Sequence, residues 1–288
     1  MKNIFIILNY NSFLATKKLT ESISDFKNIY HIVIVDNAST DEDTQRLNDL
    51  KSNKITVLFL SKNNGYAAGN NAGIRFSIRK FGLNTTLFIA NPDISVTDDT
   101  VYEMSSFILK NDANKVGMVA PIMHNNRTAW RFTSLYKTIF LESGILPKFT
   151  KSFSFYDRFY AKSISHSRQK FLEVDVLAGA FFALSAKAFS EINYFDENTF
   201  LYYEEEILAI KLTSKKYSNY LLMNCEYEHK HDYSTDTNKV RKVKIMNQSR
   251  KYFFDQYFKL TKFDKKMLKL SDRENLFLAY LSDKKRNS

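Results

Sequence analysis

Residues 85–93 read Thr-Thr-Leu-Phe-Ile-Ala-Asn-Pro-Asp, an apolar run that ends in polar turn residues. A short apolar run before a turn signal is typical of a β-strand covered on both faces. Pro92 forces Asn91 into an extended conformation, so the chain leaves the strand without starting a helix. We therefore predict a buried strand over residues 85–90, with Asp93 at the carboxyl edge of its sheet.

The same pattern extends to both sides of this strand. Strands are predicted over residues 3–8, 31–35, 55–60, 85–90 and 116–120, and helices over residues 12–26, 41–50, 67–80 and 98–110. Strands that alternate with helices of about 10–15 residues predict βαβ units on a mainly parallel sheet. The predicted fold class is therefore α/β, with a Rossmann-like, mainly parallel central sheet flanked by helices.

Small polar residues follow four of the predicted strands. The clusters are Asn9-Tyr10-Asn11, Asp36-Asn37-Ala38-Ser39, Asn63-Asn64-Gly65 and Asn91-Pro92-Asp93. Because ligands of open α/β sheets bind beyond the carboxyl ends of the strands, we expect a site for a polar ligand at this edge.

Each cluster also has a purely structural interpretation. Asp93 can hold Mg²⁺ or Mn²⁺ together with water and substrate phosphates, or it can cap the following helix. Asp36 can hydrogen-bond a nucleobase or ribose, or help to cap the next helix. Residues 64–71, where Gly65 and Gly69 open a helix, resemble a phosphate loop only loosely, because they lack the GxGxxG spacing and the lysine of a P-loop.

Acidic and histidine residues stand out in the second half of the chain. Glu204-Glu205-Glu206 follows Phe195-Asp196-Glu197 and an aromatic run. Successive helical residues point about 100° apart, so at most two of the three glutamates can reach one site. Apolar neighbours can raise the pKa of such a carboxyl towards the range of a general base. The alternative is an acidic first helical turn. His229 and His231, two residues apart, suit a metal or a pyrophosphate, or are surface residues without a role.

Composition excludes several classes of protein. The chain of 288 residues is 44% apolar and 25% charged, which argues against disorder and low complexity. The longest apolar stretch, about residues 176–184, is far shorter than the roughly 20 residues of a membrane helix. Residues 4–8 are too short an apolar run for a secretory signal. A single cysteine, Cys225, suits a reducing compartment. These features predict a cytoplasmic protein.

The net charge of +11 is concentrated at the C-terminus. Residues 239–288 hold 15 Lys/Arg and 5 Asp/Glu, a balance of +10, whereas residues 1–238 hold 27 and 26, a balance of +1. Apolar residues recur there at helical spacing among lysines: Phe253, Tyr257, Leu260, Phe263, Met267 and Leu270. This pattern predicts a basic amphipathic helical tail that docks on the anionic inner face of the cell membrane. The alternative is a helix packed on the body, with a solvated basic face.

Taken in order, a series of segments resembles the family 2 glycosyltransferases, in particular their rhamnosyltransferase-like branch. The segments are Ile7–Asn11, Val35–Asp41, Asn64–Asn71, Asn91–Asp93, Gly179–Phe182, Phe195–Glu197 and Tyr203–Glu206. The resemblance spans about residues 1–235. It implies a GT-A catalytic domain over residues 1–238, with a nucleotide-sugar-binding half over about 1–120 and an acceptor half over about 121–238. It also implies inverting transfer of a sugar from a UDP- or dTDP-linked donor to a glycan hydroxyl, with Mn²⁺ or Mg²⁺ as cofactor.

The resemblance also implies roles for single residues. Asp36 would contact the nucleobase. Asp93 would be the metal-binding aspartate of a DXD-like motif, in which Asn91 is a weaker ligand. His229 matches a histidine that is often associated with the metal or the diphosphate. The implied donor-binding residues are Asn9, Asp36, Asn64, Gly65, Asn70, Asn91 and Asp93.

Three acidic residues are candidates for the implied catalytic base. Glu205 stands where many members carry the candidate catalytic aspartate. Ile207 and Lys211 stand where members often carry Asp and Arg. These departures leave Glu204 and Asp196 as alternatives for the base.

Two other functions fit parts of the sequence. A sugar nucleotidylyltransferase would share the layout, but it ordinarily has a glycine-rich loop after the first strand, where this chain has Asn9-Tyr10-Asn11. A nucleic-acid-binding protein would fit the isoelectric point of about 9.4. However, the positive charge lies in the tail, and the sheet edge is acidic and rich in asparagine. We therefore expect a nucleotide-sugar donor and a lipid-linked saccharide acceptor as partners, and no nucleic acid.

Overall fold

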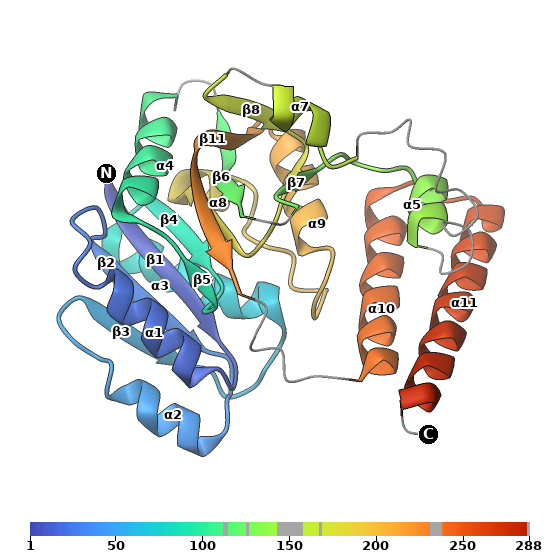
Figure 1. Ribbon diagram of the computed structural model, residues 1–288, viewed down its shortest axis with the longest axis horizontal. Coiled ribbons are helices and arrows are strands. Elements are labelled where there is room, and N and C mark those ends of the chain that lie inside the picture. The colour runs from blue at the N-terminus through green and yellow to red at the C-terminus, as the bar shows by residue number, and fades with distance from the viewer. Residues whose placement is uncertain (112–114, 125–126, 143–157, 167–168, 231–237, 287–288) are drawn as a thin grey trace.

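The computed structural model describes residues 1–111, 115–124, 127–142, 158–166, 169–230 and 238–286. Helices cover both faces of a nine-stranded sheet (Figure 1). The strands of this sheet are β1 (Lys2–Asn9), β2 (His31–Asp36), β3 (Ile55–Phe59), β4 (Thr85–Ala90), β5 (Ile94–Ser95), β6 (Val116–Met123), β8 (Phe171–Val174), β10 (Phe181–Ser185) and β11 (Ser218–His229). Their order is β3-β2-β1-β4-β10-β6-β11-β5, with β8 paired to β11. A small second sheet pairs β7 (Ala129–Trp130) with β9 (Val176–Leu177).

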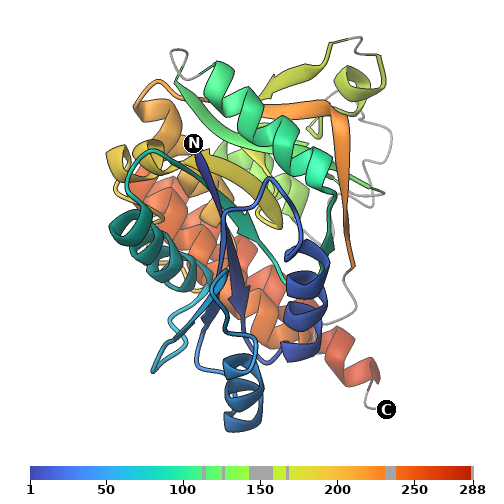
Figure 2. The same cartoon turned by 90° about the vertical axis from the view of Figure 1, so that its left-hand side faces the viewer.

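The helices lie around this sheet, as Figure 2 shows from the side. They are α1 (Phe13–Ile23), α2 (Asp41–Asn48), α3 (Tyr66–Phe81), α4 (Asp98–Lys110), α5 (Leu135–Glu142), α7 (Ala161–His166), α8 (Ala186–Glu191), α9 (Glu204–Ser214), α10 (Lys239–Tyr257) and α11 (Lys262–Arg286). Within the described residues, no helix combines the length and the apolar character needed to cross a bilayer.

The first half of the chain confirms the predicted α/β fold. Strands β3, β2, β1 and β4 are parallel neighbours. Alternate residues of β1 enter two different cores: Ile4 and Ile6 pack with α3 and α8, and Phe5 and Ile7 pack with α1 and α4. Burial on both faces explains the continuous apolar runs, since each buried side chain of this size contributes about 1.5–3 kcal/mol.

The second half departs from simple alternation. Strand β10 runs antiparallel between β4 and β6. Its start lies beside the turn after β4, where the Asn91 N–H donates to the Ala180 carbonyl at 2.8 Å. The end of β11 pairs with β5, and this register sets His229 opposite Ile94. Three segments that are distant in sequence therefore meet at the carboxyl end of β4.

The basic tail forms two helices. Helices α10 and α11 lie side by side, away from the sheet (Figure 1), and run antiparallel, because the Val240 N–H at the start of α10 donates to Asp283 near the end of α11. Between them Phe258 is extended, with φ −132° and ψ 148°. A new helix then begins, because Thr261 and Asp264 form reciprocal capping hydrogen bonds.

The expectation that Phe253 to Leu270 line one face of a single helix is therefore wrong. Phe253 is buried, together with Phe254, against Ile207 of α9. The first part of the apolar pattern thus packs the tail onto the body, and the helix break separates it from the second part. Arg250, with no exposed surface, holds the two helices together through an ion pair with Asp272.

Candidate active site

A cavity of about 360 Å³ opens at the carboxyl end of β4, where the segments that contain Asn91, Ala180 and His229 meet. It is lined by Tyr66, Asn91, Met123, Ala178, Gly179, Ala180, Leu201, Tyr202, Glu204, Glu205 and His229. The structure thus brings together four predicted site residues: Asn91, Glu204, Glu205 and His229. The volume is in the range that holds a small-molecule ligand.

His229 lines this cavity, and Asp93, which is not part of the lining, contacts His229. Asp93 Oδ1 lies 3.1 Å from His229 Nε2, and both side chains are largely buried. The pairing of β5 with β11 fixes this contact, because the Lys230 N–H also donates to the Asp93 carbonyl at 2.9 Å. His231 lies outside the described residues.

The Asp93–His229 pair fits a divalent cation. Carboxylate oxygen and imidazole nitrogen are both ligands for such ions. Among the described residues, no cluster of three or more His, Cys, Asp or Glu residues could hold a metal by itself. Two protein ligands leave the other coordination positions to phosphate oxygens and water, which suits a cation that binds together with a diphosphate.

Glu204 and Glu205 begin helix α9 and also line the cavity. Tyr202 and Tyr203, with φ values of 74° and 69°, turn the chain sharply into the helix. The Gly179 N–H donates to Glu205 Oε1 at 3.1 Å. A Cβ on Gly179 would lie 2.6 Å from that oxygen, so only glycine allows this close approach.

The two buried carboxyl groups differ in their surroundings. Burial raises the pKa of both, and that of Glu204 reaches about 8, with the negative charge of Glu205 contributing. Glu204 is 4% exposed, and its Oε1 has no hydrogen-bond partner among the described residues. The Gly179 N–H stabilises a negative charge on Glu205. Near neutral pH we therefore assign a proton to Glu204, and the Gly179 N–H favours the charged form of Glu205.

Glu204→Gln is expected to stabilise the protein at alkaline pH. Native Glu204 keeps its proton up to about pH 8, whereas the unfolded chain loses it near pH 4.5. The native state binds more protons in this window, so the free energy of unfolding falls as pH rises. In the variant this fall should be absent. Its free energy of unfolding should therefore exceed that of wild type by roughly 2–4 kcal/mol above pH 8 and by almost nothing at pH 5.

Urea unfolding at pH 5, 7 and 9 measures this difference. Glu42→Gln, which changes an exposed glutamate, is the matched control. A stability difference between wild type and Glu204→Gln that is the same at all three pH values would contradict the assignment of the proton to Glu204.

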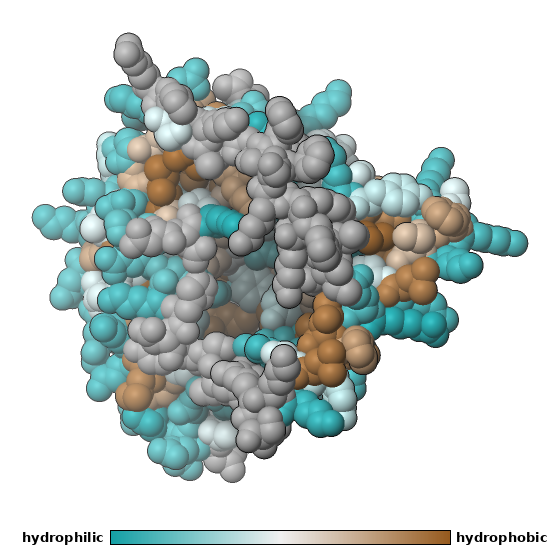
Figure 3. Space-filling view, turned by 45° about the vertical axis from the view of Figure 1, so that its right-hand side comes forward, coloured by the Kyte–Doolittle hydropathy of each residue, from teal (hydrophilic) through white to brown (hydrophobic). Residues whose placement is uncertain are grey.

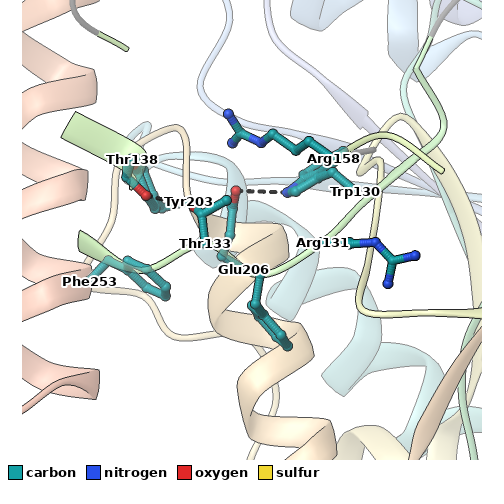
Figure 4. Close-up of a pocket in the computed structure, with 9 residues that line it drawn as sticks. Trp130, Arg131, Thr133, Thr138, Arg158, Tyr203, Glu206 and Phe253 are labelled. Carbon is teal, nitrogen blue, oxygen red and sulfur yellow. Dashed lines mark hydrogen bonds between the residues drawn. The ribbon is translucent and has the colours of Figure 1, made fainter. Parts of the chain in front are cut away.

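Glu206 points away from the cavity. Its Oε1 accepts a hydrogen bond from Trp130 Nε1 at 3.0 Å, beside Thr133 and Phe253 (Figure 4). The expectation that at most two of the three glutamates reach one site is confirmed.

Asp36 and Asn9 are paired at the ends of β2 and β1. Asn9 Nδ2 donates to Asp36 Oδ1 at 3.0 Å, and the Thr16 hydroxyl donates to Asn9 Oδ1 at 2.7 Å. The Ser39 hydroxyl and N–H also donate to the Asp36 carboxylate. Both side chains are buried within this network, so Asp36 orders the turn after β2. Its contact with a nucleobase stays a prediction.

The glycine loop before α3 supports the acidic side of the cavity. Gly65 has φ +97°, and a Cβ there would lie 2.2 Å from the Phe200 carbonyl oxygen. The Tyr66 N–H donates to that same carbonyl at 2.9 Å. Asn64 is exposed, whereas Asn70 is buried and donates to the Tyr66 carbonyl. Donor binding by Asn64, Gly65 and Asn70 stays a prediction.

The structure does not bring Asp196 to the cavity. Its Oδ2 accepts hydrogen bonds from the Tyr252 and Tyr257 hydroxyls of α10 at 2.8 and 2.7 Å. Burial acts to raise its pKa, but the hydrogen bonds from these tyrosines and from Asn198 hold that pKa below its ordinary value. Asp196 thus anchors α10 to the body.

Tyrosines complete the site, and the sequence did not mark them as candidates. The Tyr66 hydroxyl donates to the Gly179 carbonyl at 2.7 Å. It therefore holds in place the glycine whose N–H donates to Glu205. Burial and the charge of Glu205 raise the pKa of Tyr66 and of Tyr227, so both phenols stay protonated. Tyr66 follows Gly65 in a motif that the sequence does mark. Tyr227 and Tyr202 carry no such signal.

The sequence profile described as "Glycosyl transferase family 2" matches residues 4–192. The chain belongs to this family. A curated relative is the "Low-salt glycan biosynthesis hexosyltransferase Agl10" of Haloferax volcanii, which is 26% identical over 202 residues. The match covers 69% of this chain and 58% of the relative, so the family 2 chain spans little more than half the length of that protein.

Solved structures of low sequence identity share the GT-A fold. One is a crystal structure of GalNAc-T7 with UDP, GalNAc and Mn²⁺, with a TM-score of 0.62 and 13% identity, over 89% of this chain and 49% of the other. Another is the mannosyltransferase PcManGT from Pyrobaculum calidifontis with GDP-Man and Mn²⁺, with a TM-score of 0.58 and 13% identity, over 97% and 73% of the two chains. The S. aureus TarS 1–349 structure has a TM-score of 0.53 and 15% identity, over 98% and 72%.

Proposed function

We propose that this chain is a metal-dependent, inverting hexosyltransferase. It moves a sugar from a UDP- or dTDP-linked donor to a hydroxyl group of a glycan. The observation that carries this proposal is the placement of Glu205 in the same cavity as His229 and Asn91, with Asp93 in contact with His229. Family membership and the GT-A fold support it.

The donor diphosphate binds beside Asp93 and His229. These two residues would hold Mn²⁺ or Mg²⁺, and solved neighbours of the same fold contain Mn²⁺. When bound, the cation stabilises the negative charge that develops on the leaving diphosphate. Asn91 contributes to the same edge of the cavity. The nucleoside lies towards Asn9 and Asp36, with Asn64, Gly65 and Asn70 along its path.

Glu205 acts as the general base. It takes the proton of the acceptor hydroxyl as the oxygen attacks the anomeric carbon from the face opposite the diphosphate. The new carbon–oxygen bond forms as the bond from that carbon to the diphosphate oxygen breaks, so the configuration inverts without a covalent enzyme intermediate. Gly179 holds the carboxylate in place. Neutral Glu204 adds no second negative charge near the base.

The acceptor is a lipid-linked saccharide in cell-surface polysaccharide synthesis. Transfer takes place at the inner face of the cell membrane, where the enzyme is a peripheral protein. A relative named for glycan biosynthesis supports this assignment, as does the charge of +10 in residues 239–288.

A panel of nucleotide sugars tests the proposal. Thermal-shift and saturation-transfer NMR measurements with UDP-hexoses and dTDP-rhamnose, with and without Mn²⁺, should show metal-dependent binding of one donor class. Selectivity for dTDP-rhamnose would place the chain in the rhamnosyltransferase-like branch. Nucleotide-sugar formation from a sugar 1-phosphate and a nucleoside triphosphate would instead show a nucleotidylyltransferase. A DNA gel shift at physiological salt, without donor binding, would show a nucleic-acid-binding protein.

A further inference from the structure

Helix α11 has a buried face and, on the opposite side, an exposed apolar face. The face towards α10 and the body buries Leu268, Ser271, Asn275 and Ala279. On the other side large apolar residues recur at intervals of seven, seven and four residues: Phe263, Leu270, Phe277 and Leu281. With 3.6 residues per helical turn, these intervals keep the four side chains on one side of the helix. We call them the outer face.

The outer face is open to solvent. The exposed fractions are 61% for Phe263, 48% for Leu270, 61% for Phe277 and 40% for Leu281. Apolar surface appears among hydrophilic residues on the side of the molecule that α10 and α11 form (Figure 3). Single exposed apolar residues are ordinary, but a continuous row of them on one helix marks an interaction surface.

Unpaired cations flank the outer face. They are Lys262, Lys266, Lys269, Arg273 and Lys284, all exposed and without an ion-pair partner in the described part of the chain. Three of the four acidic residues of α11 are bound elsewhere: Asp264 to Thr261, Asp272 to Arg250 and Asp283 to Val240. The fourth, Glu274, is half-buried and lies one helical turn from Leu270 and Phe277, on the outer face itself. Five exposed cations outnumber this one carboxylate, so the net charge that α11 presents on this side is positive.

We propose that the outer face of α11 docks on an anionic lipid bilayer, with the helix lying in the plane of the interface. Phenylalanine and leucine side chains enter the boundary between headgroups and acyl chains, while the lysine and arginine heads stay with the lipid phosphates. This surface differs from the one expected from the sequence. It includes Phe277 and Leu281 and leaves out Phe253, which is buried. The inference rests on the peripheral membrane location proposed above, and it adds which surface of the protein contacts the membrane.

The charge pattern favours a bilayer over two other occupants. A second copy of this face would bring two rows of cations together, which is repulsive. A nucleic acid would satisfy the cations but would leave four large apolar side chains in water. An anionic bilayer satisfies both the charges and the apolar row.

Vesicle sedimentation with the full chain tests the surface. We expect the wild type to bind phosphatidylcholine vesicles that contain phosphatidylglycerol, to bind pure phosphatidylcholine weakly, and to lose binding as salt rises. Leu270→Glu and Phe277→Glu should each lower the partition coefficient between vesicles and water by about tenfold or more. Each substitution removes an apolar side chain that the bilayer would bury. Leu109→Glu is the matched control, because Leu109 on α4 is 57% exposed and lies outside α11.

Several outcomes would overturn the proposal. One is equal sedimentation of Phe277→Glu and wild type. Another is a dimer in light scattering that Leu270→Glu dissociates, which would assign the face to a second copy. A third is DNA binding that Lys266→Glu with Arg273→Glu abolishes and Phe277→Glu leaves unchanged. Sedimentation needs no sugar donor, so an enzyme that fails to transfer sugar would still be tested for docking, and Glu205→Gln should bind vesicles like wild type.

Discussion

Glu205→Gln is expected to lower the rate of sugar transfer about 10²–10⁴-fold, the usual contribution of a general base. The substitution keeps the size of the side chain and an oxygen that can accept from the Gly179 N–H, 3.1 Å away in the wild type. It removes only the ability to take a proton. Donor affinity should therefore stay near the wild-type value, because the residues proposed to bind the donor diphosphate are Asp93 and His229, not Glu205.

Release of the nucleoside diphosphate at saturating donor measures the rate. Glu204→Gln and Asp196→Asn are the matched variants, since each removes one of the other candidate carboxylates. We expect both to keep far more activity, because Glu204 is already protonated at neutral pH and Asp196 binds Tyr252 and Tyr257 of α10. If Glu204→Gln loses this much activity and Glu205→Gln stays active, the general base is Glu204 and the rest of the mechanism is unchanged.

The pH dependence of the rate gives a second measurement. Burial raises the pKa of the Glu205 carboxyl above its ordinary value. The base is inactive when it is protonated, so transfer should fall on the acid side at a pH above the usual range of a glutamate. A rate that stays constant down to pH 4 would exclude a buried carboxylate as the base.

The sequence predicted the first half of the fold closely because its signals are local there. Residues 85–90 were predicted as a strand and form β4, and residues 98–110 were predicted as a helix and form α4. In both cases the apolar period and the turn residues agree with tertiary packing. The polar clusters at the strand ends then place Asp36 and Asp93 at one edge of the sheet, because parallel strands end together.

The second half could not be predicted in the same way. The apolar run of β10 shows burial on both faces, but it carries no signal of direction, and β10 runs antiparallel between β4 and β6. The contact between Asp93 and His229 depends on the pairing of β5 with β11, which joins residues far apart in the chain.

The roles of two acidic residues also depend on distant partners. Asp196 and Glu205 were both candidates for the base, and both stand among aromatic residues in the sequence. In the structure Asp196 contacts tyrosines of α10, more than fifty positions along the chain, whereas Glu205 contacts Gly179. The sequence does carry a local signal for the break between α10 and α11, namely Thr261 followed by Asp264. The apolar residues continue at helical spacing across this point, so the spacing alone does not show the break.

Asp93→Ala is expected to abolish metal-dependent donor binding and to lower transfer by about 10³-fold or more, since charge stabilisation by a metal contributes several kcal/mol. The side chain supplies one of the two protein groups that fit the cation, and His229 alone holds an ion poorly. The fold should survive, because Lys230 pairs with the backbone carbonyl of Asp93, which alanine retains. Calorimetric titration of the donor, with and without Mn²⁺, and thermal unfolding measure the two effects.

The comparison that decides this prediction is between Asp93→Ala and Asp99→Ala. Asp99 is an exposed aspartate near the start of α4, so its loss changes the net charge by the same amount without touching the cavity. If the cation binds through Asp93, only Asp93→Ala should lose the Mn²⁺-dependent part of donor affinity, and His229→Ala should weaken it as well. Wild-type turnover in the presence of EDTA, or normal turnover of Asp93→Ala, would show that the carboxylate only orders the turn between β4 and β5.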